Sequence, residues 1–338
     1  MVDYVKVEVY GCNYDNWTKN QFLEFEGNYW LNTGLIEGEI VAQYNNLTFT
    51  IYESGKMCFK GSLHKYYNRL QKVKAPSQHT KKEIEKGFNG NTFNYTQLCY
   101  VLKDLNNKFN INLGQSILRN IEFGLNIAHQ FNTEKILDNL MFHKGKLFCN
   151  PKSTNYKELL HTQYRIKCYN KSLQYGIKNN LMRYEIHFKK MKQVNDIDIV
   201  YLSDLKNRSL LNKVKNVLLI YWKEILFYDY TINESLLTHK EQVLILQFKN
   251  PLYWKGIKSN HLDRPKKKYY GIEAKHSMQL KNKISELIKN QWEQLNTNCV
   301  TFDQHFKPKN NNCVTNDHSS IGLILTQQQT KSYNHLSC

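Results

Sequence analysis

Short runs in which apolar and polar residues alternate dominate the first half of the chain. At positions 5–9, valine alternates with lysine and glutamate, which is the period of a half-buried β-strand. Residues 47–52 and 56–61 are also rich in β-forming residues, and Glu53-Ser54-Gly55 between them predicts the turn of a hairpin. The same reasoning predicts further strands at residues 39–44, 117–127, 146–149, 164–169 and 182–189. The pattern therefore favours a sheet built mainly from antiparallel strands.

Helical spacing of apolar residues occurs in three places. Between residues 95 and 108, the residues Leu98, Val101, Leu102 and Leu105 fall on one face of a helix. Residues 205–226 and 275–295 show the same spacing, whereas the polar, lysine-rich residues 70–91 predict a loop. Strands and helices that do not alternate regularly are typical of an α+β protein.

Two changes in composition predict the domain organisation. We expect a domain of antiparallel strands and helices over residues 1–200 and a mostly helical C-terminal region over residues 201–298. Residues 299–338 are rich in Asn, Gln, Ser and Thr and poor in apolar residues, which predicts a disordered polar tail.

Charge narrows the class of partner. The 338 residues carry a formal net charge of +18, which favours a polyanionic partner such as DNA. An AT-rich coding sequence would also enrich lysine, so charge alone leaves this interpretation open. The eight cysteines form no Cys-x-x-Cys pair, which argues against a zinc ribbon. No signal peptide or membrane span is recognisable, and we expect a cytoplasmic protein with no membrane partner.

One predicted strand places a tyrosine among cations. Arg165, Lys167, Tyr169 and Lys171 share one face, because alternate residues of a strand point the same way. Neighbouring cations lower the pKa of a phenol and can bind the phosphate that a phenolate attacks. The alternative is a half-buried edge strand with a solvated basic face.

Two further strands carry candidate metal ligands. Arg183, Glu185, His187 and Lys189 share one face of the strand at 182–189, and a carboxylate and an imidazole two residues apart can hold one divalent ion. Glu122 faces away from the core side of its strand, and Gly124 beside it permits a close approach. A surface ladder of alternating charges is the alternative interpretation.

Other polar residues are candidates for contact with DNA. The segment 60–68 combines Gly and Ser with Lys and His, which suits phosphate contact, although His64 could equally be a packing residue. A short basic cluster follows at residues 264–268. The predicted DNA-contacting residues are Lys60, Ser62, His64, Lys65, Asn68, Arg165, Lys167, Arg183, Lys189, Arg264, Lys266 and Lys267. No ATPase, serine hydrolase, zincin or dinucleotide motif is present.

In their order along the chain, four of these segments resemble the phage/plasmid replication protein II/X family, the filamentous-phage gene II initiators. The segments are KGSLHKYYN (60–68), LRNIEFGLNI (118–127), RIKCYNKSLQYG (165–176) and LMRYEIHFKKM (181–191). NPLYWKGIK (250–258) and the helix predicted at 275–295 are similar to the C-terminal region of that family.

The resemblance implies a sheet-based nickase domain, related to the His-x-His endonucleases but with that motif degenerate. It implies nicking of one strand at a phage or plasmid origin during rolling-circle replication. Tyr169 falls at the position of the nucleophile and Lys171 at that of its lysine, while Glu122 and Glu185 match the acidic positions. The chain departs from the family in having Asn120 where the family has arginine.

The resemblance also implies a reaction and a set of partners. Tyr169 would form a 5′-phosphotyrosine with the aid of Mg²⁺ or Mn²⁺ held by Glu122, Glu185 and His187, and reversal would rejoin the strand. Tyr175 is the second candidate nucleophile. The partners would be single-stranded and supercoiled origin DNA, a host helicase and a polymerase. The alternatives are a non-catalytic origin- or single-strand-binding protein, a conjugative relaxase and an RNA-binding phage protein.

Overall fold

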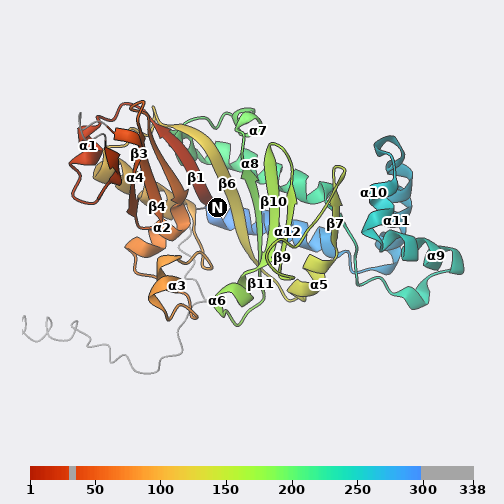
Figure 1. The fold of residues 1–338 in the computed structure, drawn as a ribbon. Coiled ribbons are helices and arrows are strands. Elements are labelled where there is room, and N and C mark those ends of the chain that lie inside the picture. The colour runs from red at the N-terminus through yellow and green to blue at the C-terminus, as the bar shows by residue number, and fades with distance from the viewer. Residues whose placement is uncertain (30–35, 298–338) are drawn as a thin grey trace, which may run out of the picture. The chain divides into compact units, whose positions relative to one another are not determined.

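The computed structural model of the chain describes residues 1–29 and 36–297 and contains a large antiparallel sheet (Figure 1). Nine strands form this sheet in the order β2-β3-β4-β5-β1-β6-β11-β10-β9, and every neighbouring pair is antiparallel. The strands are β1 (Val2–Val9), β2 (Glu26–Tyr29), β3 (Ile36–Tyr44), β4 (Leu47–Tyr52), β5 (Met57–Ser62), β6 (Ile117–Ala128), β9 (Tyr156–Leu160), β10 (Tyr164–Asn170) and β11 (Leu181–Phe188). The α+β class predicted from the sequence is therefore present.

Helices and a second, small sheet complete the described chain. The helices are α1 (Asp15–Thr18), α2 (Leu63–Leu70), α3 (Lys81–Glu85), α4 (Tyr95–Phe109), α5 (Thr133–Asp138), α6 (Lys171–Tyr175), α7 (Lys192–Asn195), α8 (Arg208–Glu224), α9 (His239–Phe248), α10 (Pro251–Gly256), α11 (Asp263–His276) and α12 (Leu280–Asn296). Short 3-10 helices are η1 (Leu202–Lys206), η2 (Glu234–Leu236) and η3 (Ser259–His261). The small sheet joins β12 (Leu226–Phe227), β7 (Leu140–His143) and β8 (Lys146–Leu147).

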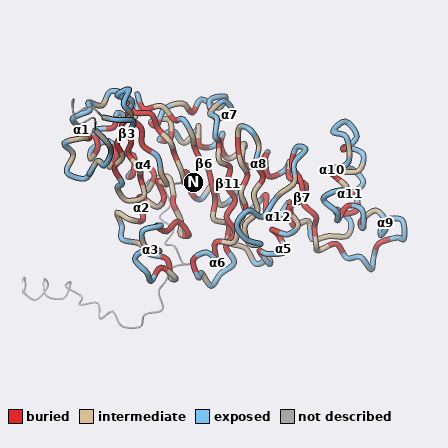
Figure 2. Tube along the Cα trace, viewed as in Figure 1, coloured by how far each residue is buried: buried red, intermediate tan, exposed pale blue. Residues whose placement is uncertain are grey.

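One face of the nine-stranded sheet is buried beneath helices. Alternate apolar residues of the central strands point to this face, and they are buried in Figure 2, whereas much of the helix surface is exposed. The ring of Phe109 at the end of α4 packs 4.6 Å from that of Phe49 on β4. On the other half of the sheet, Trp292 of α12 meets Phe123 of β6, and Tyr184 of β11 donates a hydrogen bond to the carbonyl of Leu218 in α8. The opposite face of the sheet is thus left to polar side chains.

A second hydrophobic cluster lies around the small sheet and the helices α9, α10 and α11. Trp254 and Tyr269 are fully buried in it, and their rings lie 6.2 Å apart. The hydroxyl of Tyr269 accepts a hydrogen bond from the backbone of Asp229 and donates one to the carbonyl of Phe227. The Asp229 carboxylate in turn accepts the backbone N–H of Leu280, which fixes the start of α12.

Most of the predicted elements are confirmed within one to three residues, but three differ. The predicted loop at 70–91 contains the helix α3, which begins with a capping box formed by Thr80 and Glu83. The predicted helix at 275–295 is divided between the end of α11 and α12, with residues 277–279 between them. The predicted strand at 146–149 is only the two-residue β8. The predicted tail at 299–338 lies outside the described residues, and no helix of the described part is long and apolar enough to cross a membrane.

Candidate functional site

The strands β6, β11 and β10 present a row of polar side chains on the face opposite α8 and α12. In the register of these strands, Glu185 lies opposite Gly124 on one side and Lys167 on the other. His187 lies between Glu122 and Arg165 in the same way. The structure therefore brings together the side chains that the alternation of residues assigned to this face.

Three carboxylates meet on this face. Asp3 of β1, Glu122 of β6 and Glu185 of β11 are all buried, and one oxygen from each lies within 4.8 Å of the others. Among the described residues they form the one group of three or more side chains placed to hold a metal ion. Asp3 was not identified from the sequence. The available signal was a carboxylate in a strand that is otherwise apolar at Val2 and Val5.

Gly124 provides the space in which the site is assembled. A Cβ atom at this position would lie 2.7 Å from Nη2 of Arg183 and 2.7 Å from Cγ of Glu185. Both side chains cross the backbone of β6 at this point, so no larger residue fits unless they move. The close approach expected at Gly124 is made by two side chains of the neighbouring strand.

Two cations neutralise much of the carboxylate charge. Lys167 lies between Glu122 and Glu185, in contact with both, and its Nζ is 2.6 Å from Oε2 of Glu185. Arg183 bridges the other pair, with Nε 2.6 Å from Glu185 Oε1 and Nη2 2.8 Å from Asp3 Oδ2.

The same contacts set the ionisation of the cluster. Burial alone would raise the pKa of Glu185, but the charges of Lys167 and Arg183 outweigh it and hold the pKa well below its usual range. Burial alone would lower the pKa of Lys167, but the charges of Glu185 and Glu122 outweigh burial and raise this pKa above its usual value. The Glu185 carboxylate is therefore ionised, as a metal ligand must be.

The three carboxylates are suitable ligands for a divalent cation, provided that the Lys167 ammonium moves away from them. Carboxylate oxygens are the ligands that Mg²⁺ and Mn²⁺ prefer. Three carboxylates face two cations, so a divalent ion added to the closed network would leave an excess of positive charge in a buried place. Withdrawal of the Lys167 ammonium would make the group neutral with the ion bound.

His187 lies beside this group and contacts one of its members. Its Nδ1 is 3.1 Å from Oε2 of Glu122, and its ring lies 5.6 Å from that of Tyr4. The imidazole therefore contacts a carboxylate of the group. It does not belong to the set whose ligand atoms approach within 4.8 Å.

Tyr169 reaches the same carboxylates from β10. Its hydroxyl donates a hydrogen bond of 3.0 Å to Oε1 of Glu185, and its ring lies 5.3 Å from that of Tyr156. Burial, together with the charge of Glu185, raises the pKa of Tyr169 well above its usual value. The expectation that flanking cations would lower this pKa is therefore wrong, because Lys167 is held by carboxylates and the phenol faces Glu185.

Lys171 lies in a buried pocket between two tyrosines. Its ammonium is 5.0 Å from the ring centre of Tyr169 and 4.8 Å from that of Tyr175, and it donates a 2.6 Å hydrogen bond to Oδ1 of Asn89. Burial lowers the pKa of Lys171 to about 7. The Tyr175 hydroxyl also donates to Asn89, whose amide donates to Asp3. Tyr175 is thus linked to the carboxylates through one intervening side chain, whereas Tyr169 touches them directly.

The predicted DNA-contacting residues divide into exposed and buried sets. The exposed ones are Lys60, Lys189, Arg264 and Lys267, and the partly exposed ones are Ser62, Lys65, Arg165, Lys167 and Lys266. The buried ones are His64, Asn68 and Arg183.

The buried set is occupied by contacts within the protein. His64 stacks on Phe93 and bonds Asn91 through Nε2 at 2.7 Å, and Asn68 donates to the carbonyl of Phe88. Arg183 uses its donors on Asp3, Glu185 and Asn126. Direct contact with DNA, as predicted for these three, is disfavoured by their burial, and their contacts support the carboxylate group and its surroundings.

Comparison with known proteins adds little to this geometry. No protein-family model and no curated protein matches the chain. Among solved structures, the rolling circle replication initiator protein from Geobacillus stearothermophilus is similar, with a TM-score of 0.37 and 13% sequence identity, over 72% of this chain and 90% of that one. A likeness of this size establishes neither a common fold nor a common function.

Proposed function

We propose that the chain is a rolling-circle replication initiator that nicks one DNA strand through Tyr169. The observation that carries the proposal is the hydrogen bond from the Tyr169 hydroxyl to Glu185, one of three carboxylates gathered on the polar sheet face. A nucleophile, a carboxylate that orients it and a group of cation ligands are parts that a metal-dependent phosphoryl transfer uses. The strand motifs that resemble the phage/plasmid replication protein II/X family support the same assignment.

The proposed reaction is a transesterification. The Tyr169 oxygen attacks the scissile phosphate, and the bond between phosphorus and the 3′ oxygen breaks. The hydrogen bond to Glu185 orients the Tyr169 hydroxyl. Its proton passes to water as the new bond forms, and the departing 3′ oxygen takes a proton from water. The products are a 5′-phosphotyrosine and a free 3′-OH, which a host polymerase and helicase would use. Attack by a 3′-OH on the phosphotyrosine rejoins a strand.

The surrounding residues hold the reacting groups in place. A Mg²⁺ or Mn²⁺ ion bound by Asp3, Glu122 and Glu185 would polarise the scissile phosphate. Arg183 fixes two of these carboxylates, and Lys171 places its side-chain amine beside the phenol. Lys167, once released from the carboxylates, would neutralise charge that develops on the phosphate.

A covalent-adduct assay tests this proposal directly. A pool of single-stranded oligonucleotides labelled at the 3′ end is incubated with the protein and Mn²⁺ and resolved in SDS. We expect the 3′ label to move with the wild-type protein and with Tyr175→Phe, and to be absent with Tyr169→Phe. Tyr156→Phe is the matched control, because its ring packs on Tyr169 while its hydroxyl bonds Glu158. An adduct formed by Tyr169→Phe and lost in Tyr175→Phe would assign the reaction to Tyr175.

One observation favours a second function, a non-catalytic DNA-binding protein. Lys167 and Arg183 already satisfy the carboxylates, so the group is stable as a closed ion network that stiffens the sheet. The exposed cations would then bind DNA with no chemistry. This function predicts retarded complexes on a native gel and no covalent adduct at any concentration of Mg²⁺ or Mn²⁺.

A further inference from the structure

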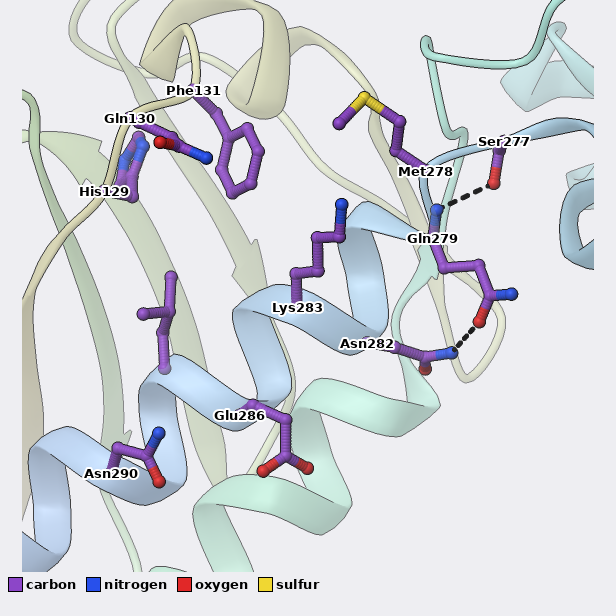
Figure 3. Close-up of a pocket in the computed structure, with 11 residues that line it drawn as sticks. His129, Gln130, Phe131, Ser277, Met278, Gln279, Asn282, Lys283, Glu286 and Asn290 are labelled. Carbon is purple, nitrogen blue, oxygen red and sulfur yellow. Dashed lines mark hydrogen bonds between the residues drawn. The ribbon is translucent and has the colours of Figure 1, made fainter.

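A groove of about 670 Å³ lies between the end of β6 and the start of α12 (Figure 3), and none of the three carboxylates lines it. Residues His129, Gln130 and Phe131 form one wall, in the turn that follows β6. The other wall consists of residues 277–279 and the first turns of α12. The volume is sufficient for a small planar ligand and part of its surroundings.

Two apolar side chains face each other across the groove with a cation between them. Figure 3 shows the ring of Phe131 on one side, Met278 on the other, and Lys283 rising from α12 toward the space between them. Met278 is 52% exposed, although a thioether side chain is commonly buried. No described carboxylate lies within ion-pair distance of the Lys283 ammonium, and Glu286 points away from it (Figure 3). The groove therefore combines an apolar slot between Phe131 and Met278 with a lysine that has no ion-pair partner in the described part of the chain.

That combination matches one nucleotide of a single strand. An unpaired base has two apolar faces that stack on an aromatic ring, and its phosphate carries the negative charge that a lysine attracts. An apolar peptide side chain would fill the slot but leave the ammonium of Lys283 without a counter-ion. A base within a duplex could not enter, because both of its faces are already stacked.

The groove is connected to the candidate nucleophile through the chain. The side-chain amide of Asn180 donates to the carbonyl of Phe131 at 3.0 Å, and the backbone carbonyl of Asn180 accepts the N–H of His129. Residues 176–180 lead back from this contact to α6, which contains Lys171 and Tyr175. His129 directly follows β6 and is seven positions from Glu122, or roughly 23 Å along the strand direction. Because α12 lines the groove and lies on the face of the sheet opposite the carboxylates, a strand joined to Tyr169 would pass round the end of β6 to reach it.

We propose that the groove between Phe131 and Met278 binds an unpaired nucleotide of the DNA strand, with the base on the Phe131 ring and the phosphate at Lys283. The inference rests on the proposed function for the identity of the ligand, and it assigns a contact outside the site of nicking.

The test measures binding of a fluorescent oligothymidylate of about 12 nucleotides by anisotropy over a range of salt concentrations. Phe131→Leu keeps apolar packing but removes the aromatic face, and we expect roughly tenfold weaker binding. Lys283→Ala should weaken binding and reduce the slope of log affinity against log salt by about 0.7. Lys289→Ala is the matched control, since it removes an exposed lysine from the same helix outside the groove and should leave the slope unchanged.

Each outcome separates this inference from the nickase proposal. Unchanged affinity for Phe131→Leu, or equal effects of Lys283→Ala and Lys289→Ala, overturns the groove even if the wild type forms the covalent adduct. Weaker binding by Phe131→Leu in a protein that forms no adduct supports the groove and contradicts the nickase. Competition by a duplex of the same sequence as strongly as by the single strand also overturns the inference.

Discussion

Replacement of Lys167 by methionine removes the ammonium group that lies between Glu122 and Glu185 and keeps the length of the side chain. Both carboxylates are buried, so the variant leaves them facing each other with one cation fewer. Loss of one partner from a buried ion pair destabilises a protein by about 3–5 kcal/mol. In EDTA we therefore expect the free energy of unfolding of Lys167→Met to fall by that amount.

The same substitution should improve the binding of a divalent ion. In the wild type the ion must displace the Lys167 ammonium, and two unit charges 4 Å apart interact by about 4 kcal/mol at an effective dielectric constant of 20. The substitution gains only part of this energy, because in the wild type the displaced ammonium can turn to solvent. We expect the affinity of Lys167→Met for Mn²⁺ to be at least about tenfold higher than that of the wild type. Mn²⁺ at 100 times its dissociation constant would then restore about 2.7 kcal/mol of stability.

Urea denaturation with and without Mn²⁺, together with calorimetric titration of Mn²⁺, measures both effects. Lys157→Met on β9 is the control, because its partner Asp138 is 62% exposed and the pair should contribute less than about 1 kcal/mol. If Lys167→Met binds Mn²⁺ no more tightly than the wild type, the carboxylates are not the cation site. If it is as stable as the wild type in EDTA, the buried ion pair does not contribute as argued.

Three other substitutions test separate parts of the structure. Gly124→Ala should lower the free energy of unfolding by about 1–3 kcal/mol and the yield of covalent adduct at least about tenfold, because the new Cβ overlaps Arg183 and Glu185; a variant with normal adduct yield contradicts this. Asp3→Asn should weaken Mn²⁺ binding about tenfold, measured by the same titration, through loss of one of three charged ligands. Burial raises the pKa of Glu273 to about 7, so its carboxyl is kept protonated in the native state and the stability of the wild type falls as pH rises from about 4.5 to about 7. Glu273→Gln lacks this fall and should be more stable than the wild type by up to about 3 kcal/mol at pH 8 but not at pH 4, in urea denaturation at both values.

The strands and most long helices could be predicted because their signals are local. Alternation of residues gave β1, β4, β5, β6, β10 and β11, and it also gave the shared face of Glu185 and His187. At α3 the local signals conflict, because Thr80 and Glu83 form a capping-box pattern while the lysines around them indicate a loop.

The parts of the site that depend on sheet order could not be predicted. Asp3 joins Glu122 because β1 pairs with β6, and nothing within either strand indicates that pairing. The raised pKa of Tyr169 also depends on sheet order, because it comes from burial and from the charge of Glu185 on the neighbouring strand. Burial of His64 and Asn68 follows from packing against residues 88–93, which a pattern of exposed-looking polar residues does not reveal.

The position of Gly124 opposite Glu185 also governs how the sheet can form. A shift of one residue between β6 and β11 would turn Arg183, Glu185 and His187 toward the helices. The described residues on that face form an apolar core that offers these charged side chains no counter-ion. Burial of unpaired charges in that core would cost several kcal/mol each, so misaligned sheets are disfavoured during folding. The carboxylates and their cations thus specify the register between β6 and β11. A descendant that had lost every chemical activity would still need them to align these strands.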